Sequence, residues 1–550
     1  MAREKQYWKS LQERGAQERG ALEHHDDALL RELQEEFPEA PQELPGGWSR
    51  RGFLQAAGFA VAGAVLTGCH RAPVQKAIPL LIQPEFLTPG RAVYYASTCG
   101  GCSAACGILI KNRDGRPIKL EGNRQHPVSR GGLCAVGQAS VLGLYDSLRL
   151  KDPLIDGKAA AWQDVDAAVM ARLRDAAKSE RGICFLSGTN TSPTRRALIE
   201  KFLRTFPVSR HIVYDPLSSS AILDAHERTH GVRVLPRYQF DRAEVVASFD
   251  ADFLGTWISP VEFAAGHASR RTLETPSPRL SYHAQFESRM SLTGSKADLR
   301  RAVPPGEIGL LLNQLAQRVE KAAGGESNWG ELAETSVAAN ALDELARRLW
   351  ENRGQSLVVC GVQDVPTQIV CNYLNHLLGN YGNTLDIERP SLQRQGNDQA
   401  LETLQQDLRD GKVAALLVDG VDPVAELPEG DQLAAWLKRV PLRISFQDHL
   451  DETTRLAHYV CPDNHSLESW GDAEPVSGVV SLAQPAIAPL GNRRSMLETL
   501  SAWAGDARPA YDLIRDHWRQ NIFLRQKAQA SFDTFWELSL HDGYAVVDAE

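Results

Sequence analysis

The sequence predicts an α/β protein with doubly wound sheets, preceded by a small β-rich domain. Runs such as 182–188 and 413–420 are apolar throughout rather than at every second residue. They alternate along the chain with helix-like segments such as 308–319 and 339–350. Continuously apolar strands are typical of parallel sheets whose two faces are both covered by helices. We therefore expect Rossmann-like layers, with further strands at 243–249, 355–361 and 442–448 and further helices at 194–206 and 431–440.

Length and composition indicate an ordinary globular protein with several domains. The chain has 550 residues, of which 43% are hydrophobic and 23% charged, and about 150 residues per domain gives three or four domains. The net charge of -9 argues against nucleic acid as a partner, because phosphate binding needs clustered Lys and Arg. Nine cysteines are too few and too clustered for the disulfide framework of a short secreted protein.

Four of the cysteines follow the spacing C-x2-C-x3-C-x27-C, and they are Cys99, Cys102, Cys106 and Cys134. Three closely spaced cysteines with one remote cysteine are typical of a 4Fe-4S cluster, whereas zinc sites usually pair two short cysteine knuckles. We therefore expect one 4Fe-4S cluster on these four thiolates. A structural zinc ion and two disulfides are the alternatives.

The segment between the third and fourth cysteines is predicted to be a β-hairpin. Two apolar runs within 107–122 flank the turn residues Asp114 and Gly115, which is the usual hairpin signal. The hairpin would bring Cys134 back to the other three cysteines. Glycines at 100, 101 and 107 would let the backbone approach the bound group closely.

The N-terminal region carries an address signal. Arg50 and Arg51 precede the uncharged stretch 53–66, which ends in a Leu-Thr-Gly-Cys box at Cys69. This pattern resembles a twin-arginine export signal with a lipoprotein cleavage site. The stretch is shorter than the about 20 residues of a membrane-spanning helix. We expect export by the twin-arginine route and a mature chain that begins at a lipid-modified Cys69 on the periplasmic face of the inner membrane; a buried helix after an exposed arginine pair is the alternative.

Segment 95–155 resembles the N-terminal iron-sulfur domain of the molybdopterin oxidoreductase (DMSO reductase) family. Segments 372–387, 415–428 and 447–500 resemble, in this order, later elements of its pterin region. The resemblance implies that the loops at 187–192 and 419–423 correspond to those that hold the nucleotide ends of a pterin cofactor. Small polar loops after strands are also the ordinary way to begin a helix.

Three departures from that family predict a scaffold without molybdopterin, without a molybdenum ligand and without catalytic residues. Val136 stands where the family commonly has Lys or Arg, two residues after the fourth cysteine. The only candidates for a metal ligand in the first α/β domain are Ser218, Ser219 and Ser220, and serines beside proline usually form turns and helix caps. Segment 506–550 is too short for the family's closing C-terminal barrel.

A narrower resemblance covers most of the chain. Segments 6–13, 237–264 and 287–298, together with the export signal, are similar to the molybdopterin-enzyme-like part of the iron-sulfur subunit of alternative complex III. The resemblance implies a subunit of a membrane-bound quinol:electron-acceptor oxidoreductase that does not itself catalyse. Its alternatives are a catalytic molybdopterin-dependent subunit and a cofactor-free assembly subunit.

The same resemblance implies the partners. The remaining cysteines of the body are isolated, which is typical of plain core residues, and they are Cys184, Cys360, Cys371 and Cys461. Further clusters would therefore belong to a separate multi-cluster ferredoxin-like subunit. The other expected partners are integral membrane quinol-binding subunits and c-type cytochrome subunits.

One further pattern, His226-Glu227-x-x-His230, matches the zinc-protease signature H-E-x-x-H. The helix expected here ends at Gly231 and would place both histidines on one side. No convincing third ligand follows, so an exposed polar helix end is the favoured interpretation.

The expected domain organisation follows from these signals. It comprises an arm with the export signal and lipid box at 1–69, a linker with the 4Fe-4S domain at 70–154, two Rossmann-like domains at 155–505 and a C-terminal tail at 506–550. One Rossmann-like domain has room to be inserted in the other.

Overall fold

The computed structural model describes residues 88, 90–273, 280–325, 329–330 and 332–549. The chain divides into two compact units, Met1–Pro84 and Glu85–Glu550, and all described residues belong to the second. The predicted export and lipidation residues Arg50, Arg51 and Cys69 lie outside the described residues.

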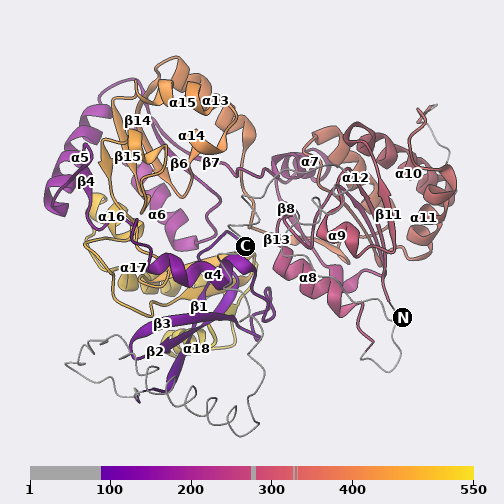
Figure 1. Cartoon of the computed structure of the whole chain (residues 1–550), viewed down its shortest axis with the longest axis horizontal. Coiled ribbons are helices and arrows are strands. Elements are labelled where there is room, and N and C mark those ends of the chain that lie inside the picture. Colours follow the sequence, from indigo (N-terminus) through magenta and orange to yellow (C-terminus); the bar gives the residue numbers. More distant parts are fainter. Residues whose placement is uncertain (1–87, 89, 274–279, 326–328, 331, 550) are drawn as a thin grey trace, which may run out of the picture. The chain divides into compact units, whose positions relative to one another are not determined.

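The largest sheet in the described part has seven strands in the order β5-β4-β16-β15-β14-β6-β7 (Figure 1). Strands β7, β6, β14, β15 and β16 are parallel, whereas β4 and β5 are antiparallel additions at one edge. Their bounds are Leu154–Ile155 (β4), Lys158–Ala159 (β5), Gly182–Ser187 (β6), Ser209–Val213 (β7), Val413–Asp419 (β14), Leu442–Ser445 (β15) and Tyr459–Val460 (β16).

Both faces of the seven-stranded sheet are covered by helices because its central strands are apolar on both sides. Ile183 and Phe185 of β6 pack in one core with α5, α6 and α16. Cys184 and Leu186 of the same strand point into another core with α13 and α15. These helices span Trp162–Ala176 (α5), Pro193–Leu203 (α6), Asp398–Arg409 (α13), Gly430–Leu437 (α15) and Met496–Trp503 (α16), and the short α14 spans Pro423–Glu426.

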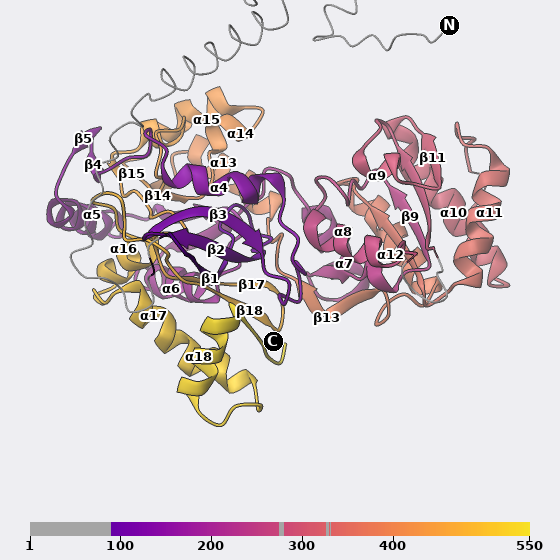
Figure 2. The same cartoon turned by 60° about the horizontal axis from the view of Figure 1, so that its bottom comes forward.

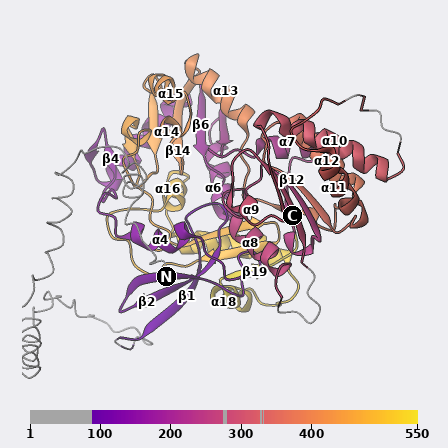
Figure 3. The ribbon, with the colours of Figure 1, turned by 45° about the vertical axis from the view of Figure 1, so that its right-hand side comes forward.

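A second, four-stranded parallel sheet has the order β11-β10-β9-β12. Its strands are Val245–Phe249 (β9), Tyr282–Glu287 (β10), Leu299–Ala302 (β11) and Ser356–Cys360 (β12). One core joins it to α10, α11 and α12, and a separate core joins its other face to α7 and α8 (Figure 3). The helices are Ser220–His230 (α7), Pro260–Ser269 (α8), Leu292–Ser295 (α9), Ile308–Ala322 (α10), Ala339–Glu351 (α11) and Val365–Leu377 (α12).

These two sheets confirm the predicted doubly wound α/β fold. The segment with the four-stranded sheet lies in sequence between β7 and β14, which are strands of the seven-stranded sheet. Because β6, β7, β14 and β15 are parallel, their carboxyl ends lie at the same edge of the sheet. These strands come from distant parts of the sequence.

Two antiparallel sheets complete the described body. The three-stranded sheet β1-β2-β3 contains the predicted hairpin, and α4 lies beside β3 (Figure 2). The five-stranded sheet has the order β19-β18-β17-β13-β8. The bounds are Ala92–Thr98 (β1), Gly107–Arg113 (β2), Arg116–Gly122 (β3), Ala135–Leu144 (α4), Leu235–Tyr238 (β8), Leu385–Ser391 (β13), Gly471–Val476 (β17), Val479–Ala483 (β18) and Tyr544–Val546 (β19).

Residues 506–549, expected to be a tail, are folded against the body. They form α17 (Ala510–His517), a π-helical turn (Trp518–Ile522), α18 (Phe532–Asp542) and strand β19. Trp518 is fully buried in the core that also holds α5 and α6. Among the described residues no sheet closes into a barrel, and none of their helices combines the length and apolar character needed to cross a membrane.

Candidate cluster loop and cavity

The first three cysteines lie in one tight loop between β1 and β2. The backbone N–H of Cys99 donates to the carbonyl oxygen of Cys106 at 2.8 Å, which closes the loop. Within it the N–H of Ala105 donates to the carbonyl of Cys102 at 3.2 Å, and Ala105 has a φ of 45°. The loop therefore turns back on itself and gathers the three thiols.

The fourth cysteine begins helix α4. The Sγ atom of Cys134 accepts a hydrogen bond from the N–H of Gly137 at 3.4 Å. A Cβ added to Gly137 would lie 3.6 Å from Sγ of Cys99, so the first turn of α4 lies beside the cysteine loop. A helix N-terminus favours negative charge, such as that of a thiolate.

The structure thus brings all four predicted cysteines together. Burial raises the pKa of the Cys106 thiol above its ordinary value, and neighbouring Cys99, Cys102 and Cys134 raise it further. The Cys99 thiol also has a raised pKa, through burial first and then through Cys102 and Cys134. All four are free cysteines, with Cys99 and Cys106 buried and the other two exposed.

This arrangement fits a cubane cluster, which binds each cysteine sulfur to a different iron. Within the described ranges, no three His, Cys, Asp or Glu side chains are placed to hold one metal ion. A bound cluster would supply one-electron chemistry, and the four thiolates would hold it.

Two of the three glycines predicted to approach the bound group pack against other parts of the protein instead. A Cβ on Gly100 would lie 2.5 Å from Cβ of Ser466, and a Cβ on Gly107 would lie 2.5 Å from Cγ of His126. These two glycines therefore let the loop pack against other parts of the protein. Of the three glycines, only Gly101 faces a ligand sulfur, since a Cβ on it would lie 3.6 Å from Sγ of Cys99.

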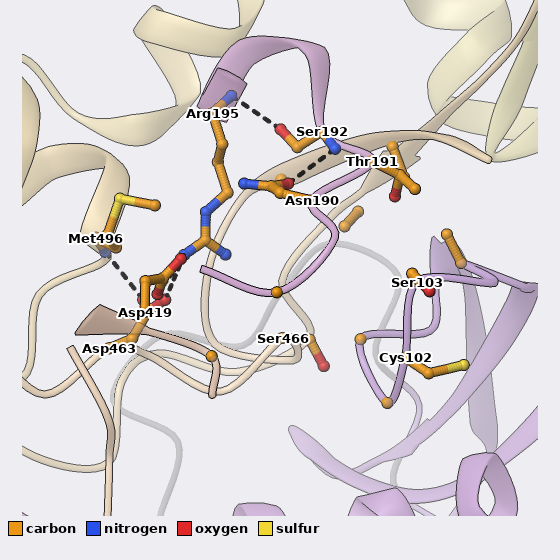
Figure 4. A pocket seen from close by; sticks show the side chains of 18 of the residues that line it. Cys102, Ser103, Asn190, Thr191, Ser192, Arg195, Asp419, Asp463, Ser466 and Met496 are labelled. Carbon is orange, nitrogen blue, oxygen red and sulfur yellow. Dashed lines mark hydrogen bonds and ion pairs between the residues drawn. The ribbon is translucent and has the colours of Figure 1, made fainter. Parts of the chain in front are cut away.

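A cavity of about 770 Å³ separates the cysteine loop from the carboxyl edge of the seven-stranded sheet. Figure 4 shows Cys102 and Ser103 on one side of it and Arg195 on the other. Its lining comes from the cysteine loop and from the segments after five strands, including 188–192, 215–217, 419–421, 446–448 and 463–466. Open α/β sheets bind their ligands at this edge.

Arg195 is held by two carboxylates of the lining. Its Nη2 atom lies 3.2 Å from Oδ1 of Asp419 and 3.1 Å from Oδ2 of Asp463 (Figure 4). Burial alone would lower the pKa of Arg195, but Asp419 and Asp463 outweigh it and raise that pKa. Burial raises the pKa of Asp463 to about 6, although Arg195 opposes the shift. Two acidic groups therefore share one guanidinium.

Another carboxylate lies at the N-terminus of α6. Asp472 accepts hydrogen bonds from the hydroxyls of Ser192 and Thr194 and, at 3.0 Å, from Nε1 of Trp518. Ser192 is the N-cap of α6 and lines the cavity. A helix N-terminus after a parallel strand is a favoured place for a phosphate. Here the carboxylate of Asp472 binds the hydroxyls of Ser192 and Thr194, and the hydroxyl of Ser192 accepts from the N–H of Arg195.

In the loop after β7, the carboxylate of Asp215 also accepts hydrogen bonds from neighbouring segments. Asp215 accepts from the N–H and the hydroxyl of Thr189, at 3.2 and 2.8 Å, and from the N–H of Gly396 at 3.1 Å. The charged side chains in the lining are the guanidinium groups Arg195 and Arg394 and the carboxylates Asp215, Asp419, Asp448, Asp463 and Asp472. Acidic groups therefore dominate the cavity.

A buried ion network fixes the iron-sulfur region to this edge. Nη2 of Arg149 lies 2.7 Å from Oε2 of Glu468, and Nε of Arg149 lies 2.9 Å from Oδ2 of Asp448. Burial alone would raise the pKa of Glu468, but hydrogen bonds from Arg149 and the N–H groups of Leu490 and His465 lower it. The segment after α4 is thereby anchored next to the cavity.

The other candidate residues have structural surroundings. Ser218 donates to Asp398 at 2.7 Å and accepts from the N–H of Ser220, and of the described residues in this stretch the cavity lining includes 215–217 but not 218–220. Val136 is 65% exposed at the start of α4. Cys184, Cys360, Cys371 and Cys461 are buried.

The protease-like pattern lies on α7, which ends at Gly231 in the left-handed conformation as expected. His226 is buried, and both of its ring nitrogens have partners: Nδ1 donates to the carbonyl of Ile222 at 2.8 Å, and Nε2 lies 3.2 Å from the hydroxyl of Tyr381. Burial lowers the pKa of His226 to about 4. His226 is therefore a buried structural side chain, so the expectation of an exposed helix end is wrong at this residue.

The fold and the four-cysteine loop resemble those of molybdopterin oxidoreductases. The model of the molybdopterin oxidoreductase Fe4S4 domain matches residues 93–146. The solved structure of acetylene hydratase from Pelobacter acetylenicus matches with a TM-score of 0.62 and 12% identity, covering 83% of this chain and 74% of that one. This likeness shows the shared fold.

Two curated relatives extend the comparison. The molybdopterin-binding-like subunit of menaquinone reductase from Nitratidesulfovibrio vulgaris is 26% identical over 508 residues, which cover 83% of this chain and 72% of that protein. A nitrate reductase from Symbiobacterium thermophilum is 32% identical over 135 residues, 24% of this chain and 17% of that enzyme. The expected resemblance to the molybdopterin oxidoreductase family is confirmed, and the chain carries that family's Fe4S4 domain.

Proposed function

We propose that this chain is a non-catalytic subunit of a membrane-bound quinol:electron-acceptor oxidoreductase of the alternative complex III type. It holds one 4Fe-4S cluster on Cys99, Cys102, Cys106 and Cys134 and no molybdopterin. The similarity to a menaquinone reductase subunit that is molybdopterin-binding-like supports a role beside quinone chemistry. The gathered thiols and the Fe4S4 domain support the cluster.

The cavity lining carries the proposal that the pterin is absent. A pterin dinucleotide brings several negative phosphates, which need donors and cations. Here Asp472 takes up the hydroxyls of Ser192 and Thr194 at the start of α6. Asp215 takes up the N–H and hydroxyl of Thr189, and Asp419 and Asp463 pair with Arg195. Adding phosphates beside these carboxylates would place like charges together, which is costly. These occupied groups support the proposed absence of the dinucleotide, and of the two arginines in the lining only Arg394 is left without a carboxylate partner among the described residues.

The proposed partners and location follow the sequence signals. Lipid on Cys69 would tether the exported body to the periplasmic face of the inner membrane after twin-arginine export at Arg50 and Arg51. A separate ferredoxin-like subunit, membrane quinol-binding subunits and c-type cytochromes would complete the complex. The cluster would exchange electrons with a neighbouring centre, and quinol would be oxidised elsewhere in the complex.

Elemental analysis of the purified complex tests the proposal. We expect about four irons per copy of this chain beyond those of the partner subunits, no molybdenum by mass spectrometry and no pterin fluorescence after extraction. About one molybdenum per chain would overturn the proposal in favour of a catalytic subunit. Absence of iron from this chain would favour a cofactor-free assembly subunit instead.

A further inference from the structure

Arg394 is a cation that reaches the cysteine loop from a remote part of the sequence. Its Nη1 atom donates to the hydroxyl of Ser103 at 2.6 Å and to the carbonyl of Gln393 at 2.9 Å. Ser103 follows Cys102 directly, and its hydroxyl donates to the same carbonyl of Gln393 at 2.6 Å. Arg394, Ser103 and Cys102 all line the cavity.

The backbone around Arg394 is fixed by the strand-end loops. Gln393 is fully buried, and the N–H of Gln395 donates to the hydroxyl of Thr189 at 2.7 Å. The N–H of Gly396 donates to Asp215 at 3.1 Å. The guanidinium of Arg394 is therefore held by a rigid segment rather than by a flexible loop.

Arg394 differs from Arg195 in that no carboxylate neutralises its charge among the described residues. Arg195 pairs with Asp419 and Asp463. Within the described residues, by contrast, no carboxylate forms an ion pair with Arg394, and its hydrogen-bond acceptors are neutral oxygens. Because Arg394 is only partly exposed, solvent and salt screen its field less than that of a surface arginine.

We propose that Arg394 sets the reduction potential of the cluster held by the four cysteines. This inference rests on the proposed cluster. Four thiolates give an oxidised cluster a net negative charge. In a titration, dithionite supplies one electron, and the cluster then becomes more negative by one charge because no proton accompanies the electron. A nearby fixed cation stabilises the more negative state and raises the potential.

The first test is an EPR-monitored redox titration of the purified full-length protein. Arg394→Gln should make reduction less favourable by about tenfold in the one-electron equilibrium constant, a shift of about 59 mV to lower potential. Arg394→Lys should keep most of the wild-type potential because it keeps the charge. Arg389→Gln is the matched control, since it removes the same charge from an exposed site on β13 and should have little effect.

Two further variants separate charge from loop packing. Ser103→Ala removes the hydroxyl that holds Arg394 but leaves the charge, so its shift should be much smaller than that of Arg394→Gln. Val136→Lys adds a cation at an exposed site. The site is close to the cysteine loop, since Cγ1 of Val136 lies 3.8 Å from a Cβ placed on Gly101. In the double variant with Arg394→Gln, the added lysine should restore the reduction potential. If Arg394→Gln alone loses iron, the double variant should regain it.

The outcomes distinguish this inference from the proposed function. Protein without iron or a cluster EPR signal would remove both. A cluster whose potential is unchanged in Arg394→Gln would overturn the inference alone. Equal shifts of the potential in Ser103→Ala and Arg394→Gln would assign Arg394 a structural role. The same conclusion would follow if Arg394→Gln lost its iron, Ser103→Ala kept it, and adding Val136→Lys to Arg394→Gln did not restore it.

Discussion

Replacing Arg149 by Met should destabilise the junction between the iron-sulfur region and the seven-stranded domain. The side chains of Arg149 and Glu468 are 1% and 0% exposed and lie 2.7 Å apart. Arg149 also donates to the carbonyl of Leu144 at 3.0 Å and to Asp448 at 2.9 Å. Met fills a similar volume but leaves Glu468 buried with fewer partners.

The expected cost follows from that unpaired charge. Removing one partner of a buried ion pair typically costs about 3–5 kcal/mol. The value here should lie at the lower end, because Nη1 of Arg493 remains 3.3 Å from Glu468. The N–H groups of Leu490 and His465 also remain, at 2.8 and 2.9 Å. About 3 kcal/mol corresponds to roughly a hundredfold change in the unfolding equilibrium, at about 1.4 kcal/mol per tenfold.

Urea denaturation of the full-length protein, followed by tryptophan fluorescence, measures this change. Arg347→Met is the matched control: Arg347 pairs with Glu344 and Glu351 at 2.7 Å but is 53% exposed on α11, so its loss should leave the midpoint close to wild type. A cycle with Glu468→Gln should be strongly non-additive. The reasoning fails if Arg149→Met costs no more than the control, or if the two changes at the junction are additive within about 0.5 kcal/mol.

Three other predictions address the cluster, the anchor and the cavity. Cys134→Ser should abolish the visible absorption and EPR signal of a 4Fe-4S cluster, whereas the buried, isolated Cys461→Ser should retain both; loss in both would point to misfolding. Cys69→Ser should release the body from membranes in salt washes that detach its partners, and Lys at both Arg50 and Arg51 should keep the protein in the cytoplasm; an unmodified N-terminus on the exported chain contradicts this. Burial raises the pKa of Asp463 to about 6, so its contribution to stability is present below about pH 4 and lost as the pH rises through about 6. Asp463→Asn should flatten the stability profile over that window, and an unchanged profile would refute the assignment.

Local patterns in the sequence were enough to predict the layers and the cysteine loop. The strands β6 and β14 are continuously apolar because both of their faces pack against helices. The hairpin at 107–122 carries its turn residues, and Asp114 and Gly115 both have positive φ. Each of these features depends on neighbours within a few residues, so sequence alone can predict it.

The cavity chemistry could not be predicted in this way. Arg195 and Asp419 are paired although 224 positions separate them, and 291 positions separate Ser103 from Arg394. Strand β17 was also missed, because its buried Asp472 and Glu474 do not look like strand residues. Asp472 accepts hydrogen bonds from the hydroxyls of Ser192 and Thr194 at the start of α6. Glu474 pairs with Arg525 at 2.6 Å. Burial of these carboxylates is stabilised only by partners from other segments.

The folded C-terminal segment explains how the cysteine loop keeps its position in the absence of a barrel among the described sheets. Asn123, which follows β3, donates to the carbonyl of Asp542 at 2.8 Å, and a Cβ on Gly543 would lie 3.0 Å from Cβ of Ala96 on β1. Trp518 from the same segment donates to Asp472 at the edge of the cavity. One short segment therefore braces both the sheet that presents the cysteines and the helix terminus that faces them. These protein–protein contacts join the two sides of the cavity, so the C-terminal segment helps to hold the cysteine loop opposite the start of α6.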